Sequence, residues 1–250
     1  MKKFPEVSAM LKSICLQLHM AVCDDERIDR EQIICMTREV LQKEEIPCDI
    51  SGYGDCEELL AAIQSGVKFH ILLLDVMMEG LNGMELAAAL RRLEDNTAII
   101  FISSNRDMAM HGYEVAALRY LEKPVDWEQL HQALVFCNEM WLKEKEILLP
   151  TASGQSRVVL SDIIYAETWE RGIRLTLKDG QKKVKARISD IAAVLPERQF
   201  VFCHRTIIVN LAFVQSIRYC ELELKSGETL PISKYRQSEM KKKFIHYLDR

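Results

Sequence analysis

Several apolar segments in the first half of the chain end at side chains that can do chemistry. The first such segment runs into a pair of carboxylates, a later one ends in another carboxylate, and two more end in a hydroxyl and an ammonium. Crowded carboxylates repel one another and need a cation. An all-oxygen site open to water suits Mg²⁺, and an Asp carboxylate can also accept a phosphoryl group. In chain order these side chains are Asp24, Asp25, Asp75, Ser103 and Lys123.

The elements that must position these groups follow from the alternation of apolar patterns. Five short apolar runs alternate with five stretches of helical periodicity, which predicts a parallel sheet covered on both faces. Ligands of such doubly wound sheets bind beyond the carboxyl ends of the strands, so we expect the groups to meet in one crevice. The predicted strands are 20–23, 48–53, 70–75, 98–104 and 119–124, and the predicted helices are 27–45, 56–64, 84–93, 107–117 and 126–146.

The residue types suggest a switch as well as a binding site. Mg²⁺ and Lys123 would neutralise phosphoryl oxygens, and Ser103 would gain a strong hydrogen-bond partner only after phosphorylation. A lone Asp-Asp pair after a strand is more often a helix cap beside a solvated turn. The spacing of the whole set favours the functional interpretation.

Four motifs in this half resemble the receiver domain of two-component response regulators over about residues 20–142. They are CDDE (23–26), LLLDVMMEGLNG (72–83), IIFISS (99–104) and RYLEKP (119–124). The resemblance implies a flavodoxin-like α/β fold with Asp75 as the phosphoacceptor. It implies a Mg²⁺ site made by Asp24, Asp25, Asp75 and the backbone carbonyl of Met77. It also implies roles for Ser103 as switch hydroxyl, Tyr120 as switch aromatic, Lys123 as phosphoryl contact and Pro124 as the residue that shapes the loop.

One position departs from the receiver pattern. The family usually has Pro four residues after the acceptor, where this chain has Glu79. The added negative charge is expected to slow attack by anionic phosphodonors or to shift metal affinity.

Length and charge divide the chain into two parts. A chain of 250 residues is long enough for about two domains. Residues 1–150 hold 15 Lys and Arg against 26 Asp and Glu, whereas residues 151–250 hold 18 against 11. We expect an extension (1–19), a receiver domain (20–142), a linker rich in Ser, Gly and Pro (143–156) and a basic domain (157–250).

Other features limit the class of protein. The longest apolar runs are about five residues, far short of the roughly 20 that a spanning helix needs, so we expect no membrane segment. Residues 1–19 do not form a convincing signal peptide, and Met20 is an alternative start. The eight cysteines form no C-x-x-C pair and are expected to be reduced core residues.

The second half reads as many short strands with helices at 188–195 and 233–248. Three of its stretches resemble the LytTR DNA-binding domain over about residues 148–249: IIYAETWERGIRLTLKDG, FVFCHRTIIVNLAFVQSI and LPISKYR. The resemblance implies a mostly β domain whose loops enter successive major grooves. It implies DNA contacts at Arg171, Arg205, Lys234, Tyr235 and Arg236, with His204 and Asn210 shaping a loop. The family often has Arg at the position of Tyr235.

Together the two halves predict a DNA-binding response regulator in the cytoplasm. A sensor histidine kinase would phosphorylate Asp75, and the receiver would then form a homodimer that binds promoter repeats in double-stranded DNA. The expected output surface comprises helix 107–117, strand 119–122 and helix 126–142. No enzymatic activity is expected beyond self-phosphorylation from a donor and slow autodephosphorylation.

Two alternatives remain. A Mg²⁺ phosphohydrolase of the haloacid-dehalogenase type would form the same aspartyl intermediate. It needs a second Asp two residues after the nucleophile as general acid, and Met77 stands there. The basic half could instead bind an acidic protein, which the salt dependence of DNA binding would distinguish.

Overall fold

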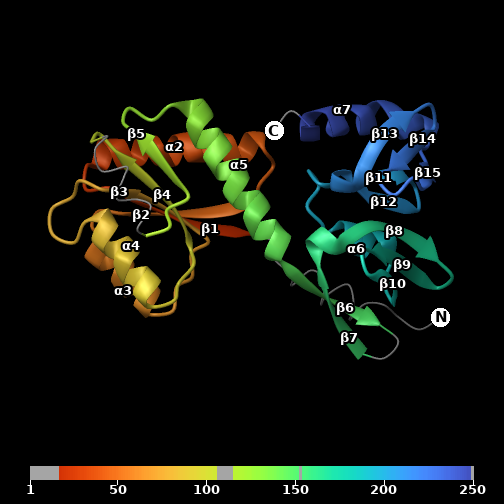
Figure 1. Cartoon of the computed structure of the whole chain (residues 1–250), viewed down its shortest axis with the longest axis horizontal. Helices are drawn as coiled ribbons and strands as arrows, with labels where there is room; N and C mark the ends of the chain where they lie inside the picture. Colours follow the sequence, from red (N-terminus) through yellow and green to blue (C-terminus); the bar gives the residue numbers. More distant parts are fainter. Residues whose placement is uncertain (1–16, 106–114, 152–153, 249–250) are drawn as a thin grey trace. The chain divides into compact units, whose positions relative to one another are not determined.

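The computed structural model describes residues 17–105, 115–151 and 154–248 (Figure 1). These residues divide into two compact units, 17–141 and 142–248, here called the N-terminal and C-terminal units. Each unit has its own sheets and its own core.

The N-terminal unit is built on one parallel sheet in the order β2-β1-β3-β4-β5. Every residue of β3 is buried, as is all but one residue of β1, because helices cover both faces of the sheet. The predicted doubly wound fold is therefore confirmed. The strands are β1 (Leu18–Cys23), β2 (Cys48–Tyr53), β3 (Ile71–Asp75), β4 (Ala98–Ser103) and β5 (Arg119–Glu122).

Four helices form the outer layers of this unit. Helices α2 (Arg27–Lys43) and α5 (Trp127–Glu144) cover one face of the sheet, and α3 (Cys56–Gln64) and α4 (Gly83–Arg92) cover the other (Figure 1). Each face has a separate apolar core, with members such as Leu134 on one side and Leu86 on the other. Local signals fix the helix starts, as at α4, where Asn82 and Glu85 form a reciprocal capping box.

Two details differ from the sequence-based expectation. Strand β1 begins at Leu18, so two residues assigned to the extension lie in the sheet; Leu18 is fully buried and pairs with Cys48. The predicted helix 107–117 lies mostly outside the described residues, and its described end, 115–117, is not helical.

The tract expected to be a linker, 143–156, is folded. Strand β6 (Glu146–Thr151) pairs with β7 (Gly154–Val159) as an antiparallel hairpin. Ile147 and Leu149 are buried while Leu148 between them is exposed, which is the alternation of a strand with one face on a core. Of the residues that suggested a linker, Pro150 lies in β6 and Gly154 and Ser156 lie in β7, whereas Ser153 is outside the described residues.

The C-terminal unit is mostly β, as predicted. An antiparallel sheet in the order β10-β9-β8-β12-β11 accompanies a three-stranded sheet, β13-β14-β15. Met240 of α7 is buried in a shared core with residues of both sheets, such as Val209 and Leu222. The elements are β8 (Ile163–Trp169), β9 (Gly172–Leu177), β10 (Gly180–Val184), β11 (Phe200–His204), β12 (Ile207–Asn210), β13 (Val214–Arg218), β14 (Glu221–Leu224), β15 (Thr229–Pro231), α6 (Ile188–Ala192), α7 (Gln237–Leu248) and the single 3₁₀ turns η2 (Leu160–Asp162), η3 (Leu211–Phe213) and η4 (Lys234–Arg236).

Two broader expectations concern the described residues. None of their helices is both long and apolar enough to span a bilayer. Their seven cysteines are free; four are buried, whereas Cys35 is exposed. Cys15 lies outside the described part.

Candidate functional site

Three carboxylates meet at the carboxyl edge of the parallel sheet. Asp24 follows β1, Asp25 comes next, and Asp75 ends β3. One oxygen from each lies within 4.8 Å of the others, although Asp24 is only 1% and Asp75 6% exposed. Backbone groups orient the two buried side chains: the Glu26 N–H donates to Asp24 Oδ1 (3.0 Å) and the Met77 N–H donates to Asp75 Oδ1 (2.8 Å).

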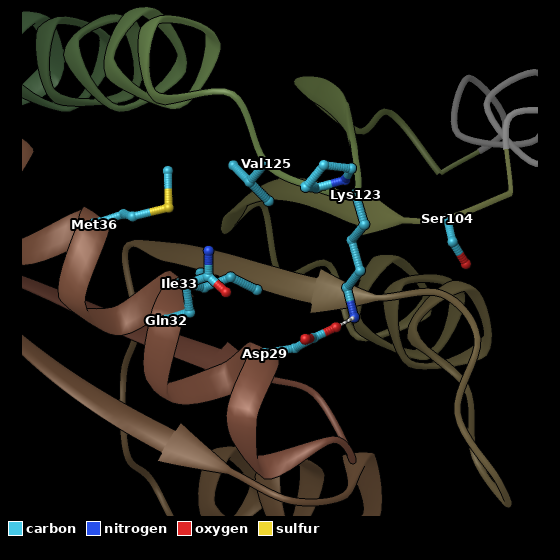
Figure 2. A pocket seen from close by; sticks show the side chains of 8 residues that line it. Asp29, Gln32, Ile33, Met36, Ser104, Lys123 and Val125 are labelled. Carbon is cyan, nitrogen blue, oxygen red and sulfur yellow. Dashed lines mark ion pairs between the residues drawn. The ribbon is translucent and has the colours of Figure 1, made fainter.

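Lys123, just beyond β5, neutralises part of this cluster. Its ammonium lies 2.8 Å from Asp24 Oδ2 and 2.7 Å from Asp75 Oδ2, and it also lies 2.9 Å from Asp29 Oδ2 on α2. Figure 2 shows the Lys123 side chain reaching across from the end of β5 to Asp29. The sheet thus brings together groups that are 99 positions apart in the chain.

The protonation of the site follows from burial and pairing. Burial raises the pKa of the Asp24 carboxyl, and its hydrogen bond with Lys123 opposes that shift only in part. Burial works against the charged form of Lys123, but its hydrogen bonds to the three carboxylates outweigh burial and raise its pKa. The ammonium is therefore a permanent countercharge at neutral pH.

Ser103 and Tyr120, predicted as switch residues, both contact the backbone of Asn105. Ser103 ends β4 and is fully buried, and its hydroxyl accepts a hydrogen bond from the Asn105 N–H (3.3 Å). The Tyr120 hydroxyl donates to the Asn105 carbonyl, and its ring lies 6.5 Å from that of Phe101. The peptide groups on either side of Asn105 thus connect a residue of β4 with a residue of β5.

The loop after β3 is shaped by a close backbone contact. A Cβ atom at Gly83, the first residue of α4, would lie 2.2 Å from the Asp75 carbonyl oxygen, so only glycine fits without a shift. Met77 and Glu79 are both exposed on this loop. Pro124 follows Lys123 through a cis peptide bond.

Asp29 contacts Lys123 but is not among the site residues predicted from the sequence. It stands in the first turn of α2, where an acidic residue usually does no more than offset the helix dipole. No sequence signal separates it from such a residue, because its contact with Lys123 depends on how the segment after β5 reaches α2 in the folded unit.

The predicted DNA-contact residues lie in three segments of the C-terminal unit. Arg171 is in the β8–β9 turn and Arg205 is in the β11–β12 turn, and both are exposed. The Thr168 N–H donates to the Thr206 carbonyl (2.9 Å), which holds these two turns at the same end of the sheet. The third segment is η4, which contains Lys234, Tyr235 and Arg236.

The third segment is joined to the second. The Ser233 N–H donates to the Cys203 carbonyl (2.9 Å), and the Arg236 guanidinium stacks on the Phe202 ring at 5.2 Å. Tyr235 extends away from these contacts and is 97% exposed. All three segments therefore lie around one end of the five-stranded sheet, with cationic and aromatic side chains presented to solvent.

The two remaining predicted residues lie at opposite ends of β12: His204 is at the β11–β12 turn, whereas Asn210 ends β12 opposite Phe200, away from the contact turns. His204 Nδ1 is 2.8 Å from the Thr206 hydroxyl, inside the β11–β12 turn. Asn210 is fully buried; it donates to the Ile163 carbonyl (2.8 Å) and its side-chain oxygen accepts from Ala212 N–H (3.0 Å) and Gln199 (3.2 Å).

Comparison with known proteins gives the same division. Residues 20–135 match the model of the response regulator receiver domain, and residues 154–245 match that of the LytTr DNA-binding domain. The sensory transduction protein LytT of Bacillus subtilis is 27% identical over 90% of this chain and 98% of its own length. The transcriptional regulatory protein BtsR of Escherichia coli is 27% identical over 87% of this chain and 95% of its own length.

The receiver domain of the Francisella response regulator 1452 has 22% sequence identity and covers 50% of this chain and 98% of that chain, with a TM-score of 0.44. Two family models in this order match most of both units of the chain, and the LytT and BtsR proteins align with it over nearly their whole length. The chain belongs to the two-component response regulators in which a receiver domain is followed by a LytTR DNA-binding domain.

Proposed function

We propose that Asp75 is the phosphoacceptor of a sensor histidine kinase and that its phosphorylation controls promoter binding by the C-terminal unit in the cytoplasm. The observation that carries this proposal is the pairing of buried Asp24 and Asp75 with the partly buried Lys123 at the carboxyl edge of the parallel sheet. A carboxylate held there can act as a nucleophile while a fixed ammonium lies within reach of the transferred group.

The transfer would proceed by attack of an Asp75 oxygen on phosphorus. A P–O bond forms, the P–N bond of a phosphohistidine breaks, and the imidazole nitrogen leaves with the electron pair. The Met77 N–H orients Asp75 through one oxygen, and Lys123 is in contact with the other. Lys123 is thus within reach of negative charge that develops on the phosphoryl oxygens.

The chemistry of the donor set fits Mg²⁺. Three carboxylates that approach within 4.8 Å, of which two are buried, leave more negative charge than one ammonium balances. Hard oxygen ligands of this kind are those that Mg²⁺ prefers. Asp24, Asp25, Asp75 and the Met77 carbonyl would hold it, and a bound Mg²⁺ supplies charge neutralisation for the transferred phosphoryl group.

Ser103 and Tyr120 would relay the modification. A phosphoryl group on Asp75 offers the Ser103 hydroxyl an acceptor, and that hydroxyl now interacts with the Asn105 N–H. Tyr120 bonds to the Asn105 carbonyl, so the two residues would rearrange together. A tenfold population shift needs only about 1.4 kcal/mol of differential stability.

The output would be a homodimer bound to promoter repeats. On α5, Phe136 and Met140 are exposed, and the Arg119 guanidinium of β5 stacks on Phe136 at 5.2 Å. These residues would contribute to the dimer surface. Two C-terminal units would then bind adjacent half-sites through Arg171, Arg205 and the 234–236 segment, which raises affinity through effective concentration. His204, Asn210 and Pro124 would shape the loops.

The test is labelling together with DNA binding. Purified full-length chain, Mg²⁺ and a radiolabelled small acyl phosphate should give an acid-stable, base-labile label that Asp75→Asn abolishes and the exposed Asp49→Asn retains. Genome-wide mapping of bound DNA should find sites occupied by wild type and lost with Asp75→Asn. Labelling that persists in Asp75→Asn, or occupancy that does not depend on Asp75, would refute the proposal.

A further inference from the structure

A third carboxylate holds the phosphoryl-contact lysine from outside the acid cluster. Asp29 Oδ2 lies 2.9 Å from the Lys123 ammonium, compared with 2.8 Å for Asp24 Oδ2 and 2.7 Å for Asp75 Oδ2. An ammonium has three N–H donors, so these three carboxylates can use all of them. A phosphoryl group therefore gains Lys123 only by displacing a carboxylate.

The three carboxylates would differ in their roles once the metal is bound and Asp75 is phosphorylated. Asp24 and Asp75 belong to the group that would hold the metal, and Asp75 is itself modified. Asp29 stands apart: its side chain is 40% exposed, whereas those of Asp24 and Asp75 are 1% and 6% exposed. It is therefore the partner whose full charge still competes for Lys123 in the phosphorylated state.

Asp29 and Lys123 both border a cavity beside α2. Asp29, Lys123, Pro124 and Val125 line a pocket of about 380 Å³, together with Gln32, Ile33, Met36 and Ser104. Figure 2 shows the Asp29 carboxylate directed at the Lys123 ammonium from the α2 side of this pocket.

We propose that Asp29 is a positioning residue that holds Lys123 towards α2 and competes with the phosphoryl group for it. This inference rests on the proposed role of Asp75 as phosphoacceptor. Asp29 then sets how strongly the phosphorylated form is stabilised, without touching the metal or the acceptor. Its removal frees one N–H of Lys123 for the phosphoryl oxygens.

The experiment measures the affinity of the full-length chain for beryllofluoride, a phosphoryl mimic, at saturating Mg²⁺ by ¹⁹F NMR. Asp29→Asn keeps the side-chain shape and should tighten binding by about two- to fivefold, the range of partly exposed ion pairs. Glu26→Gln removes the same charge from an exposed position three residues away and should change affinity less. In a Lys123→Met background, Asp29→Asn should have no effect.

Two results would overturn the inference: an equal gain in Glu26→Gln, or a gain that persists without Lys123. Either would mean general electrostatics and not competition for the ammonium. A wild-type chain that binds no beryllofluoride would refute the proposed function instead. In that case the ¹⁵N resonance of the Lys123 ammonium, measured without the mimic, still tests the contact: it must shift in Asp29→Asn and stay in place in Glu26→Gln, and an unshifted resonance in Asp29→Asn rejects it.

Discussion

The two candidate sites differ in how their side chains are held. In the N-terminal unit, Asp24 and Asp75 are buried, and both are paired with the partly buried Lys123. In the C-terminal unit, Arg171 and Arg205 stand on exposed turns, and only the backbone beneath them is fixed. The first arrangement makes function inseparable from stability, whereas the second allows binding residues to change at little cost to the fold.

The largest expected effect is the loss of Lys123. Lys123→Met leaves Asp24 and Asp75 buried without their countercharge, which should lower the free energy of unfolding by about 2–4 kcal/mol without metal. Urea denaturation checks this, and added Mg²⁺ should recover much of the loss.

The same variant has a pH signature. Because the pKa of Lys123 is raised in the folded state, its contribution to the free energy of unfolding is fully present below the ordinary lysine pKa of about 10.4. That contribution is lost as the pH rises through the pKa of the folded state. Because burial raises the pKa of Asp24, the free-energy cost of keeping this carboxylate charged in the variant is removed as falling pH protonates it. The difference in the free energy of unfolding between wild type and Lys123→Met should therefore be largest near neutral pH and should decrease at both acidic and strongly alkaline pH. A gap that does not vary with pH would argue against charge pairing.

The next effect is steric. Gly83→Ala places a methyl group against the Asp75 carbonyl, which cannot move without moving the acceptor. We expect a loss of about 1–3 kcal/mol and much slower labelling of Asp75. The matched control is Gly54→Ala, whose Cβ would meet only a flexible arginine tip at 3.7 Å. Equal labelling rates in the two variants would contradict the close contact.

Replacing the buried Asn210 of the C-terminal unit should lower the free energy of unfolding, as the changes at the site of the N-terminal unit do. Asn210→Ala leaves the Ile163 carbonyl and two donors without their partner, and should cost about 1–3 kcal/mol. Thermal unfolding measures the loss, and DNA affinity measured well below the transition should fall less than in Arg205→Ala. A selective loss of DNA binding at unchanged stability would place Asn210 at the DNA instead.

The smallest effect on stability is expected at the exposed turns. Arg205→Ala should change the free energy of unfolding by less than about 0.5 kcal/mol. It should nevertheless weaken binding to an operator fragment by about 1–3 kcal/mol if Arg205 reads a base. A uniform loss across all sequences, with a smaller salt slope, would make it a phosphate contact. A marked loss of stability would break the contrast between the two units.

Sequence alone predicted what depends on local pattern. The strands of the parallel sheet are apolar runs, and their acidic or polar ends follow from the chain order, so Asp24, Asp75, Ser103 and Lys123 were found together. The β6–β7 hairpin was missed because its Pro150 and Gly154 read as linker residues; its pairing becomes visible only when Ile147 and Leu149 are seen to be buried. Asp29 was missed because an acidic residue in the first turn of a helix is common, and the sequence does not show that Lys123 comes close to it in the folded unit.

The Ser103 and Tyr120 hydroxyls are connected through the backbone of one residue, Asn105. Ser103 accepts from the N–H of this residue, and Tyr120 donates to its carbonyl. The N–H and the carbonyl belong to the two peptide groups that flank one α-carbon, so we expect a backbone change at Asn105 that releases one hydroxyl to disturb the contact of the other. The losses in the free energy of unfolding caused by Ser103→Ala and Tyr120→Phe should then not be additive. The coupling energy from a double-mutant cycle measures how strongly the two contacts depend on each other.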